Sequence, residues 1–438
     1  RSGRVQTKAL TRRAIALGAF LAVLGIFAGS APAWAQDELS ESVRGVLRFE
    51  REPVEGVVIT VTTSDGDEIG EATSDADGRW EVGVPEAGAY LVTLDVTTLP
   101  DDIPGVEVET IETEVNATQR KAILFVLGEP GDGTGDSGGG SSGSEFSWDR
   151  VAQLSVEGLR FGVILALAAL GLSMIFGTTG LTNFSHGELI TFGAVAAWYF
   201  NDAGLPFVAA TVLAVTLGGL FGLAQDAVIW RPLRNRKTGL IAMMIVSIGL
   251  AVFLRYTYLY IFGGGRQSYR EYTIQTGIEL GPVTLAPRDI ASMVVAVVML
   301  ALVVWALSST RLGKATRAVS DNPALASASG IDVNQVIRVV WIGGAALAGL
   351  AGVLIGLSQQ VEYQMGFKTL LLVFAAVILG GLGTIWGSIL GALIVGLFIQ
   401  LSTLVIPIEL QNAGVLGVLI IVLLVRPQGI LGRRERVG

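Results

Sequence analysis

The 438-residue sequence contains no cysteine and a single histidine. The absence of cysteine excludes a disulfide, a Cys–zinc site and a lipid anchor on cysteine. One histidine without any cysteine leaves no material for a His- or Cys-based metal or nucleophile site. A nucleotide-binding loop of the form Gly-x-x-x-x-Gly-Lys-Ser/Thr is also missing, since Gly313-Lys314 is followed by Ala315. We therefore expect no catalytic residue, no metal and no cofactor, and any ATP must bind to another chain.

Charge and hydropathy are distributed unevenly. Residues 1–35 hold 5 basic and no acidic residues, residues 36–128 hold 6 basic and 21 acidic, and residues 148–438 hold 19 basic and 13 acidic. An acidic first part argues against nucleic acid as a partner. The mean hydropathy of +0.60 is high for a soluble protein, and long apolar runs recur after Trp148. The sequence therefore predicts two or three unlike domains, one of them in a lipid bilayer.

Residues 1–35 have the organisation of an export signal. A basic start precedes an apolar stretch from Ala14 to Ala28, and Ala33-Trp34-Ala35 places small residues where a signal peptidase reads them. We expect cleavage before Gln36. An uncleaved membrane anchor is the alternative, but the apolar run is short for a spanning helix.

Residues 36–128 alternate apolar and polar residues with the period of β-strands. The alternation marks four rows: Val57, Ile59, Val61; Trp80, Val82, Val84; Tyr90, Val92, Leu94, Val96; and Ile123, Phe125, Leu127. Turn signals separate the rows, and about seven short strands predict an all-β, Ig-like sandwich. Gly56-Val57 after Pro53, the stretch 73–78 and Gly88-Ala89-Tyr90 resemble the carboxypeptidase-regulatory-like family of secreted sandwiches.

Residues 129–147 form a Gly/Ser/Asp linker, and residues 148–438 read as a multi-pass α-helical membrane domain with about 8–9 spans. The candidate spans are 156–177, 187–201, 206–229, 239–262, 289–309, 337–358, 369–383, 386–406 and 412–426. Some are short and rich in glycine, which is tolerated where neighbouring helices shield the backbone.

Basic residues in the connections predict the orientation of these spans. Arginine and lysine cluster at 231–237, at 311–317 and at 426–436, whereas the other connections mix both signs. The positive-inside rule places these three segments in the cytoplasm. Counting back three spans then places Trp148 outside, which agrees with an exported, extracytoplasmic first domain.

A polar segment between two apolar runs is the first candidate site. It contains Gly180, Asn183, Phe184, Ser185, His186 and Glu188. Polar groups at membrane depth usually face a protein interior or a water-filled cavity. One interpretation is a broken helix that lines a substrate path. The other is a cytoplasmic connection whose polar groups cap two helices, and the residues alone do not decide between them.

The segment 177–189 with Gly193-Ala194 resembles the signature of the LivH-type permeases of branched-chain amino acid ABC transporters. The segments 231–234, 379–383 and 426–432 are also similar to this family, and the resemblance runs in order over about 150–434. It implies half of a transmembrane pathway in a bacterial plasma membrane. Its implied partners are a second permease subunit, two ATP-binding subunits and an extracytoplasmic substrate-binding protein. Urea and short-amide permeases look much alike, so these ligands remain the alternative to leucine, isoleucine and valine.

The connection 311–331 is the second candidate site. Asn322 can cap a helix, Pro323 fits its first turn and Gly330 can end it. Ala324-Leu325-Ala326 followed by Gly330 is similar to the coupling loop of bacterial ABC importers, although the leading glutamate and the distal proline of that motif are missing. The resemblance assigns contact with the ATPase to Gly313, Lys314, Arg317, Asp321, Asn322, Ala324, Ala326 and Gly330. The alternative is an ordinary basic loop.

Other features leave alternatives open. Gln225, Asp226 and Arg255 lie within or near spans, where snorkelling to the interface explains them as well as function does. The first domain is expected either to retain the binding protein through its acidic face and tether or to act as a surface binding or spacer module. Nothing in its residues supports an enzyme.

Overall fold

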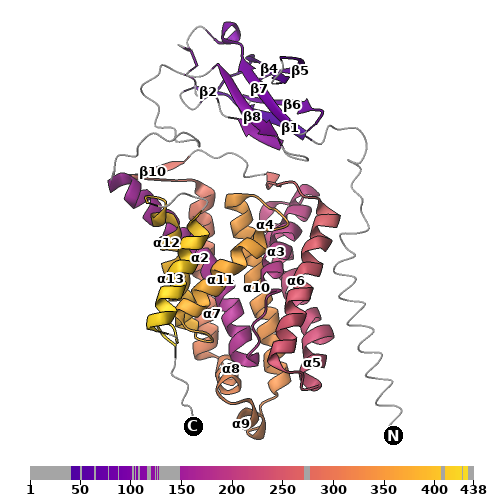
Figure 1. Cartoon of the computed structure of the whole chain (residues 1–438), viewed down its shortest axis with the longest axis vertical. Coiled ribbons are helices and arrows are strands. Elements are labelled where there is room, and N and C mark those ends of the chain that lie inside the picture. The colour runs from indigo at the N-terminus through magenta and orange to yellow at the C-terminus, as the bar shows by residue number, and fades with distance from the viewer. Residues whose placement is uncertain are drawn as a thin grey trace, which may run out of the picture. The chain divides into compact units, whose positions relative to one another are not determined.

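The computed structural model describes residues 41–49, 52–63, 66–76, 78–86, 88–100, 103, 105–106, 109–115, 120–123, 125, 127, 148–270, 277–405, 410–426 and 428–432. The expected signal at 1–35, the expected linker at 129–147 and the residues 433–438 lie outside this set. The described residues form a β unit and a helical unit (Figure 1).

The β unit contains two main sheets. Its strands are β1 (Glu41–Val46), β2 (Arg48–Phe49), β3 (Glu52–Pro53), β4 (Val58–Thr63), β5 (Glu68–Thr73), β6 (Arg79–Val84), β7 (Gly88–Leu94), β8 (Thr110–Val115) and β9 (Arg120–Ile123), with a 3₁₀ turn η2 (Val96–Thr98) after β7. One antiparallel sheet has the order β5-β4-β7-β8, and the other has the order β6-β1-β9 with β1 and β9 parallel. β2 and β3 pair separately.

The alternation predicted for this unit is present. Val57, Ile59 and Val61 are fully buried, and one hydrophobic core contains residues from both main sheets. Ser74 stabilises the turn beside that core, because its hydroxyl accepts a hydrogen bond from Val57 N and donates one to the carbonyl of Val54. Val96, expected in the third row, instead begins η2 and is exposed, since the chain leaves β7 at Leu94.

The helical unit follows from Trp148. Its helices are α2 (Trp148–Thr179), α3 (His186–Asp202), α4 (Phe207–Gln225), the π-helix η3 (Asp226–Trp230), α5 (Arg231–Asn235), α6 (Leu240–Phe262), α7 (Pro287–Ser309), α8 (Arg311–Asp321), α9 (Pro323–Ala328), α10 (Val333–Gln359), α11 (Met365–Gly380), α12 (Ile385–Ser402) and α13 (Gln411–Val425). A short hairpin of β10 (Ile278–Leu280) and β11 (Val283–Leu285) precedes α7.

A helix occupies each of the nine expected spans. Within the described part of the chain, six helical stretches are long and apolar enough to cross a membrane: Trp148–Thr179, Phe207–Asn235, Leu240–Phe262, Pro287–Ser309, Val333–Gln359 and Ile385–Ser402. α3, α11 and α13 are shorter, with 17, 16 and 15 residues. The span expected to run to residue 383 ends earlier, at Gly380, because Gly381 and Gly383 adopt positive φ values of 115° and 74°.

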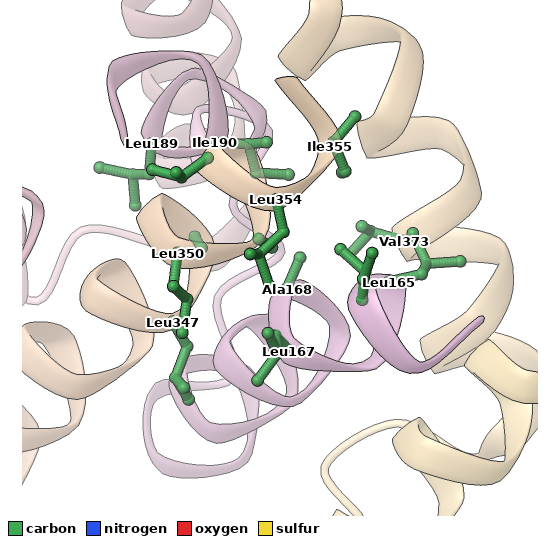
Figure 2. Packing of buried hydrophobic residues seen from close by; sticks show 14 of the residues in the cluster. Leu165, Leu167, Ala168, Leu189, Ile190, Leu347, Leu350, Leu354, Ile355 and Val373 are labelled. Carbon is green, nitrogen blue, oxygen red and sulfur yellow. The ribbon is translucent and has the colours of Figure 1, made fainter. Parts of the chain in front are cut away.

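α10 packs against α2, α3 and α4, and its small residues allow close approach. Figure 2 shows side chains of α2, α3, α10 and α11 meeting in one apolar core, with Leu350 and Leu354 of α10 beside α2 and α3. A Cβ atom on Gly352 would fall on the carbonyl oxygen of Ile190, and one on Gly193 would fall on the backbone of Gly349. Glycine at these crossings therefore lets the backbones touch.

The basic segments 231–237 and 311–317 lie at one end of the helical unit. Figure 1 shows α5, α8 and α9 together at this end. Trp230 joins the end of α2 and the start of α10 in one apolar cluster, and Gly177 lies against Ser320 of α8. The segment 428–432 reaches the same region, because Ile430 N donates to the carbonyl of Leu379 (2.8 Å).

Gly352→Ala should destabilise the helical unit by about 1–3 kcal/mol, because the added methyl group meets backbone that cannot turn away. Gly343→Ala on the same helix is the matched control. Nothing lies within 4 Å of a Cβ atom there, and the change should be neutral or stabilise by up to about 1 kcal/mol. Thermal unfolding of the purified protein in detergent measures both, and equal midpoints would contradict the crossing described.

Candidate functional site

The polar segment lies at a break between α2 and α3. Gly180 ends α2 with φ +67°, and residues 180–185 have no helical hydrogen-bond pattern. His186 then begins α3, and its Nε2 donates to the carbonyl of Ala168, in the middle of α2 (3.0 Å). α3 therefore starts well inside the bundle, beside a residue eleven positions before the end of α2.

Four of the six predicted site residues are buried at this break, and the protein itself surrounds their polar groups. The side chains of Asn183, Ser185, His186 and Glu188 are at most 1% exposed, whereas Gly180 is exposed. Asn183 Oδ1 accepts from both the backbone N–H (3.1 Å) and the hydroxyl (2.7 Å) of Ser185. These local bonds fix the turn that leads into α3.

Phe184 connects the break to two other helices. Its backbone N–H donates to the hydroxyl of Ser247 on α6 (3.0 Å), and its ring lies 5.0 Å from the ring of Phe374 on α11. Because the break leaves the Phe184 N–H without a helical acceptor, the hydroxyl of Ser247 replaces the missing carbonyl.

Glu188 forms an ion pair inside the bundle. Its Oε1 accepts from Nε (3.2 Å) and Nη2 (3.0 Å) of Arg255 on α6, and Tyr258 donates its hydroxyl to the Glu188 carbonyl (3.1 Å). The guanidinium lies 4.0 Å from the ring centre of Phe367, which gives a cation–π contact. The Arg255 side chain is only 17% exposed, so this arginine binds an acid within the protein and does not snorkel to an interface.

The beginnings of α3 and α11 meet beside this pair. A Cβ atom on Gly187 would contact the backbone of Gly366, and the hydroxyl of Thr191 accepts from Gly366 N (3.1 Å). Phe367 follows directly in α11. The structure therefore joins the predicted segment to a part of the chain about 180 residues away.

Several polar atoms at the site remain available. Asn183 Nδ2, His186 Nδ1 and Glu188 Oε2 are buried and make no hydrogen bond to any described residue. Buried polar groups are normally paired with protein or water. Together they offer a donor and acceptors to a polar molecule, whereas among the described residues no group of three His, Cys, Asp or Glu could hold a metal.

The second candidate site forms two helices at the end that carries the basic segments. Thr310 caps α8 by accepting from Gly313 N (3.2 Å), and Asn322 caps α9 by accepting from Leu325 N (3.0 Å), as predicted for Asn322. α9 ends before Gly330, whose φ is +87°. The helix expected between Asn322 and Gly330 is therefore present as α9, and α8 precedes it in the same connection.

The residues of this connection divide between buried and exposed positions. Gly313 and Ala326 are buried, whereas Lys314, Arg317, Asp321, Asn322, Ala324 and Gly330 are exposed. Ala326 packs with Val319 of α8 and Val336 of α10, and Leu325 on the outer side is 64% exposed. α9 thus projects from the bundle and is attached through α8 and α10.

A third polar cluster lies where α4 continues into the π-helix. Asp226 accepts from Arg234 (2.6 Å), and the stacked rings of Trp230 and Trp341 lie 5.6 Å apart. Gln225 is fully buried, with both amide atoms unpaired within the described residues. Snorkelling to the interface was one of two explanations left open for Gln225 and Asp226, and it does not fit their burial in the bundle.

Ser247→Ala should leave the buried N–H of Phe184 unpaired and destabilise the protein by about 1–3 kcal/mol. Thr257→Ala is the matched control on the same helix, since the Thr257 hydroxyl bonds only to the carbonyl of Phe253. Thermal unfolding of both variants compares the effects. Equal unfolding midpoints for the two variants would refute a stabilising hydrogen bond between the Phe184 N–H and Ser247.

Comparison with known proteins concerns the helical unit. The family described as "Branched-chain amino acid transport system / permease component" matches residues 154–424. The chain is 33% identical over 299 residues to the high-affinity branched-chain amino acid transport system permease protein LivH of Escherichia coli, which covers 65% of this chain and 96% of that protein.

Two further relatives match the same part of the chain. The permease protein BraD of Pseudomonas aeruginosa is 31% identical over 302 residues, covering 65% of this chain and 96% of BraD. A probable branched-chain amino acid transport permease protein LivH of Methanocaldococcus jannaschii is 30% identical over 305 residues, covering 65% of this chain and 94% of that protein. No solved structure matches.

Proposed function

The chain belongs to the family of permease components of branched-chain amino acid transport systems, and on this premise we propose that it forms half of the transmembrane pathway of an ABC importer for leucine, isoleucine and valine. It is a multi-pass plasma-membrane transport subunit and not an enzyme. The family match over residues 154–424 supports this proposal most strongly, because it includes both candidate sites.

The proposed membrane domain has nine membrane-inserted helical segments. Six helical stretches have the length and apolarity of full spans, while α3, α11 and α13 are shorter. Short and interrupted helices are typical of transporter cores, where unwound backbone lines a path for the substrate. We assign that role to the break at 180–185 and to its neighbours Asn183, Phe184, Ser185, His186 and Glu188.

The end with the basic segments is proposed to face the cytoplasm. α5, α8 and the segment after α13 all carry arginine or lysine and lie at this one end. Cytoplasmic connections are enriched in these residues. The β unit would then be extracytoplasmic, because an odd number of spans, those of α2, α3 and α4, separates Trp148 from α5.

α9 is the proposed contact with an ATPase. It projects with Leu325 exposed, and the buried methyl group of Ala326 connects it to α8 and α10. A displacement of α9 can therefore reach α10, which crosses α2, α3 and α4. Nucleotide binding would supply the free-energy difference between inward-open and outward-open states that transport requires.

The proposed complex contains a second permease subunit, two ATP-binding subunits and an extracytoplasmic binding protein. The ATP-binding subunits are required because this sequence lacks a nucleotide-binding loop. Urea or a short-chain amide carried by the same machinery is the alternative function.

Vesicles containing the assembled transporter, its binding protein and internal ATP should accumulate labelled leucine, isoleucine and valine. Urea and acetamide, tested in parallel, should not accumulate above the level measured without ATP. ATP-dependent uptake of urea or acetamide with no uptake of the three amino acids would refute the proposed substrate.

We propose that the β unit is an Ig-like sandwich of the carboxypeptidase-regulatory-like kind that holds the binding protein near the pathway. Residues 36–128 carry a net charge of −15, and the expected tether at 129–147 would raise the local concentration of a bound partner. A surface spacer without influence on transport is the alternative.

Deletion of residues 37–147 should weaken leucine uptake several-fold when the binding protein is scarce, and little when it is saturating. The reason is that a tether raises effective concentration without changing the maximal rate. Uptake measured over a range of binding-protein concentrations separates the two regimes. Identical curves for the full-length and shortened chains would favour the spacer.

A further inference from the structure

The ion pair of Glu188 and Arg255 is the least expected feature of the bundle core. Glu188 is 1% exposed on α3, and Arg255 lies about two turns before the end of α6, a helix of mostly apolar residues. Charged side chains within membrane spans are expensive, and where they occur they usually mark a substrate path. Charged side chains are not needed to hold two helices together, since apolar residues of similar volume often pack more stably than a buried ion pair.

The pair is only half satisfied by the protein. Both hydrogen bonds from Arg255 end on Oε1 of Glu188, while Oε2 is buried and bonds to no described residue. The Nη1 group of Arg255 likewise makes no hydrogen bond within the described part of the chain. A free carboxylate oxygen and a free guanidinium nitrogen therefore remain within one pair.

These two free groups match the ends of an amino acid. An α-ammonium group donates to a carboxylate oxygen, and an α-carboxylate accepts from a guanidinium nitrogen. Urea and neutral amides carry neither charge, so they can hydrogen-bond to the pair but gain no ion–ion attraction at either end.

The surroundings of the pair suit an apolar side chain. Phe367 lies under the guanidinium and is 43% exposed, Leu371 follows one turn later on α11, and the Phe184–Phe374 contact lies at the same break. Val252 and Tyr256 continue the exposed surface along α6. The pair thus lies beside apolar side chains of α6 and α11.

We propose that Glu188 and Arg255 recognise the ammonium and carboxylate groups of a zwitterionic amino acid as it passes through the membrane, and thereby select against urea and neutral amides. This inference rests on the proposed transport function and adds the residues that choose the substrate class. It assigns to Arg255 a role that the sequence alone did not indicate.

Uptake by charge variants tests the inference in vesicles that contain the whole transporter, saturating leucine-loaded binding protein and internal ATP. Glu188→Gln and Arg255→Gln should each lower the initial rate of leucine uptake at least tenfold while ATP hydrolysis continues. Lys368→Gln on α11 is the matched control, since it removes an exposed ion pair with Glu362, which precedes that helix. Its uptake rate should remain within twofold of the original protein.

The charge swap Glu188→Arg with Arg255→Glu distinguishes substrate recognition from a purely structural role of the ion pair. It restores an attractive pair between α3 and α6 but reverses the two ends offered to the substrate. Uptake should therefore stay at least tenfold low in an assembled complex, and recovery to within twofold would overturn the proposal.

If the swapped protein does not assemble, the neutral variant Glu188→Gln with Arg255→Gln decides the question, because it removes both charges and keeps a polar side chain at each position. Leucine uptake near the original rate in that variant would overturn the proposal, and a tenfold loss in an assembled complex that still hydrolyses ATP would support it. Failure of the original protein to transport leucine would instead reject the proposed function itself.

Discussion

Backbone groups in hydrocarbon have no water to bond, so a membrane protein can interrupt its helices only where other parts of the protein cover the interruption. The break at residues 180–185 is covered in this way. Ser247 accepts from the freed N–H of Phe184, Ala168 accepts from His186, and Asn183 bonds the turn internally. The position of every other part of the candidate site depends on this covered break.

Close glycine contacts make the covering possible. α3 crosses α10 at Gly193 and Gly349, and it meets the beginning of α11 at Gly187 and Gly366, where side chains would hold the backbones apart. This proximity places Glu188 against Arg255 and Phe367. At the other end of α10, Val336 packs with the two helices proposed to contact the ATPase. One helix thus connects the break proposed to line the substrate path with the end proposed to receive the mechanical input.

The sequence predicted the positions of the helices more fully than the contacts between them. Each of the nine expected spans is a mainly apolar run, so hydropathy alone located a helix there, and the positive φ of Gly381 explains why one of these helices ended early. The cap at Asn322 followed from local residue chemistry. The partner of Glu188 could not be found in this way, because Arg255 lies 67 positions away in the sequence. Since α6 is apolar on nearly all sides, its sequence does not show which face packs against α3. The start of α11 was also missed, since Gly366 and Phe367 precede the predicted span.

The central claim is that the end carrying α5 and α8 lies on the cytoplasmic side of the membrane. The absence of cysteine allows a direct measurement, since single cysteines can be labelled with a membrane-impermeant maleimide in right-side-out vesicles. Arg236→Cys and Lys314→Cys should be labelled only after the vesicles are permeabilised, whereas Leu280→Cys, in the hairpin that bonds to the start of α2 through Gln153, should be labelled from outside in intact vesicles. Labelling of Arg236→Cys or Lys314→Cys in sealed vesicles would contradict the account.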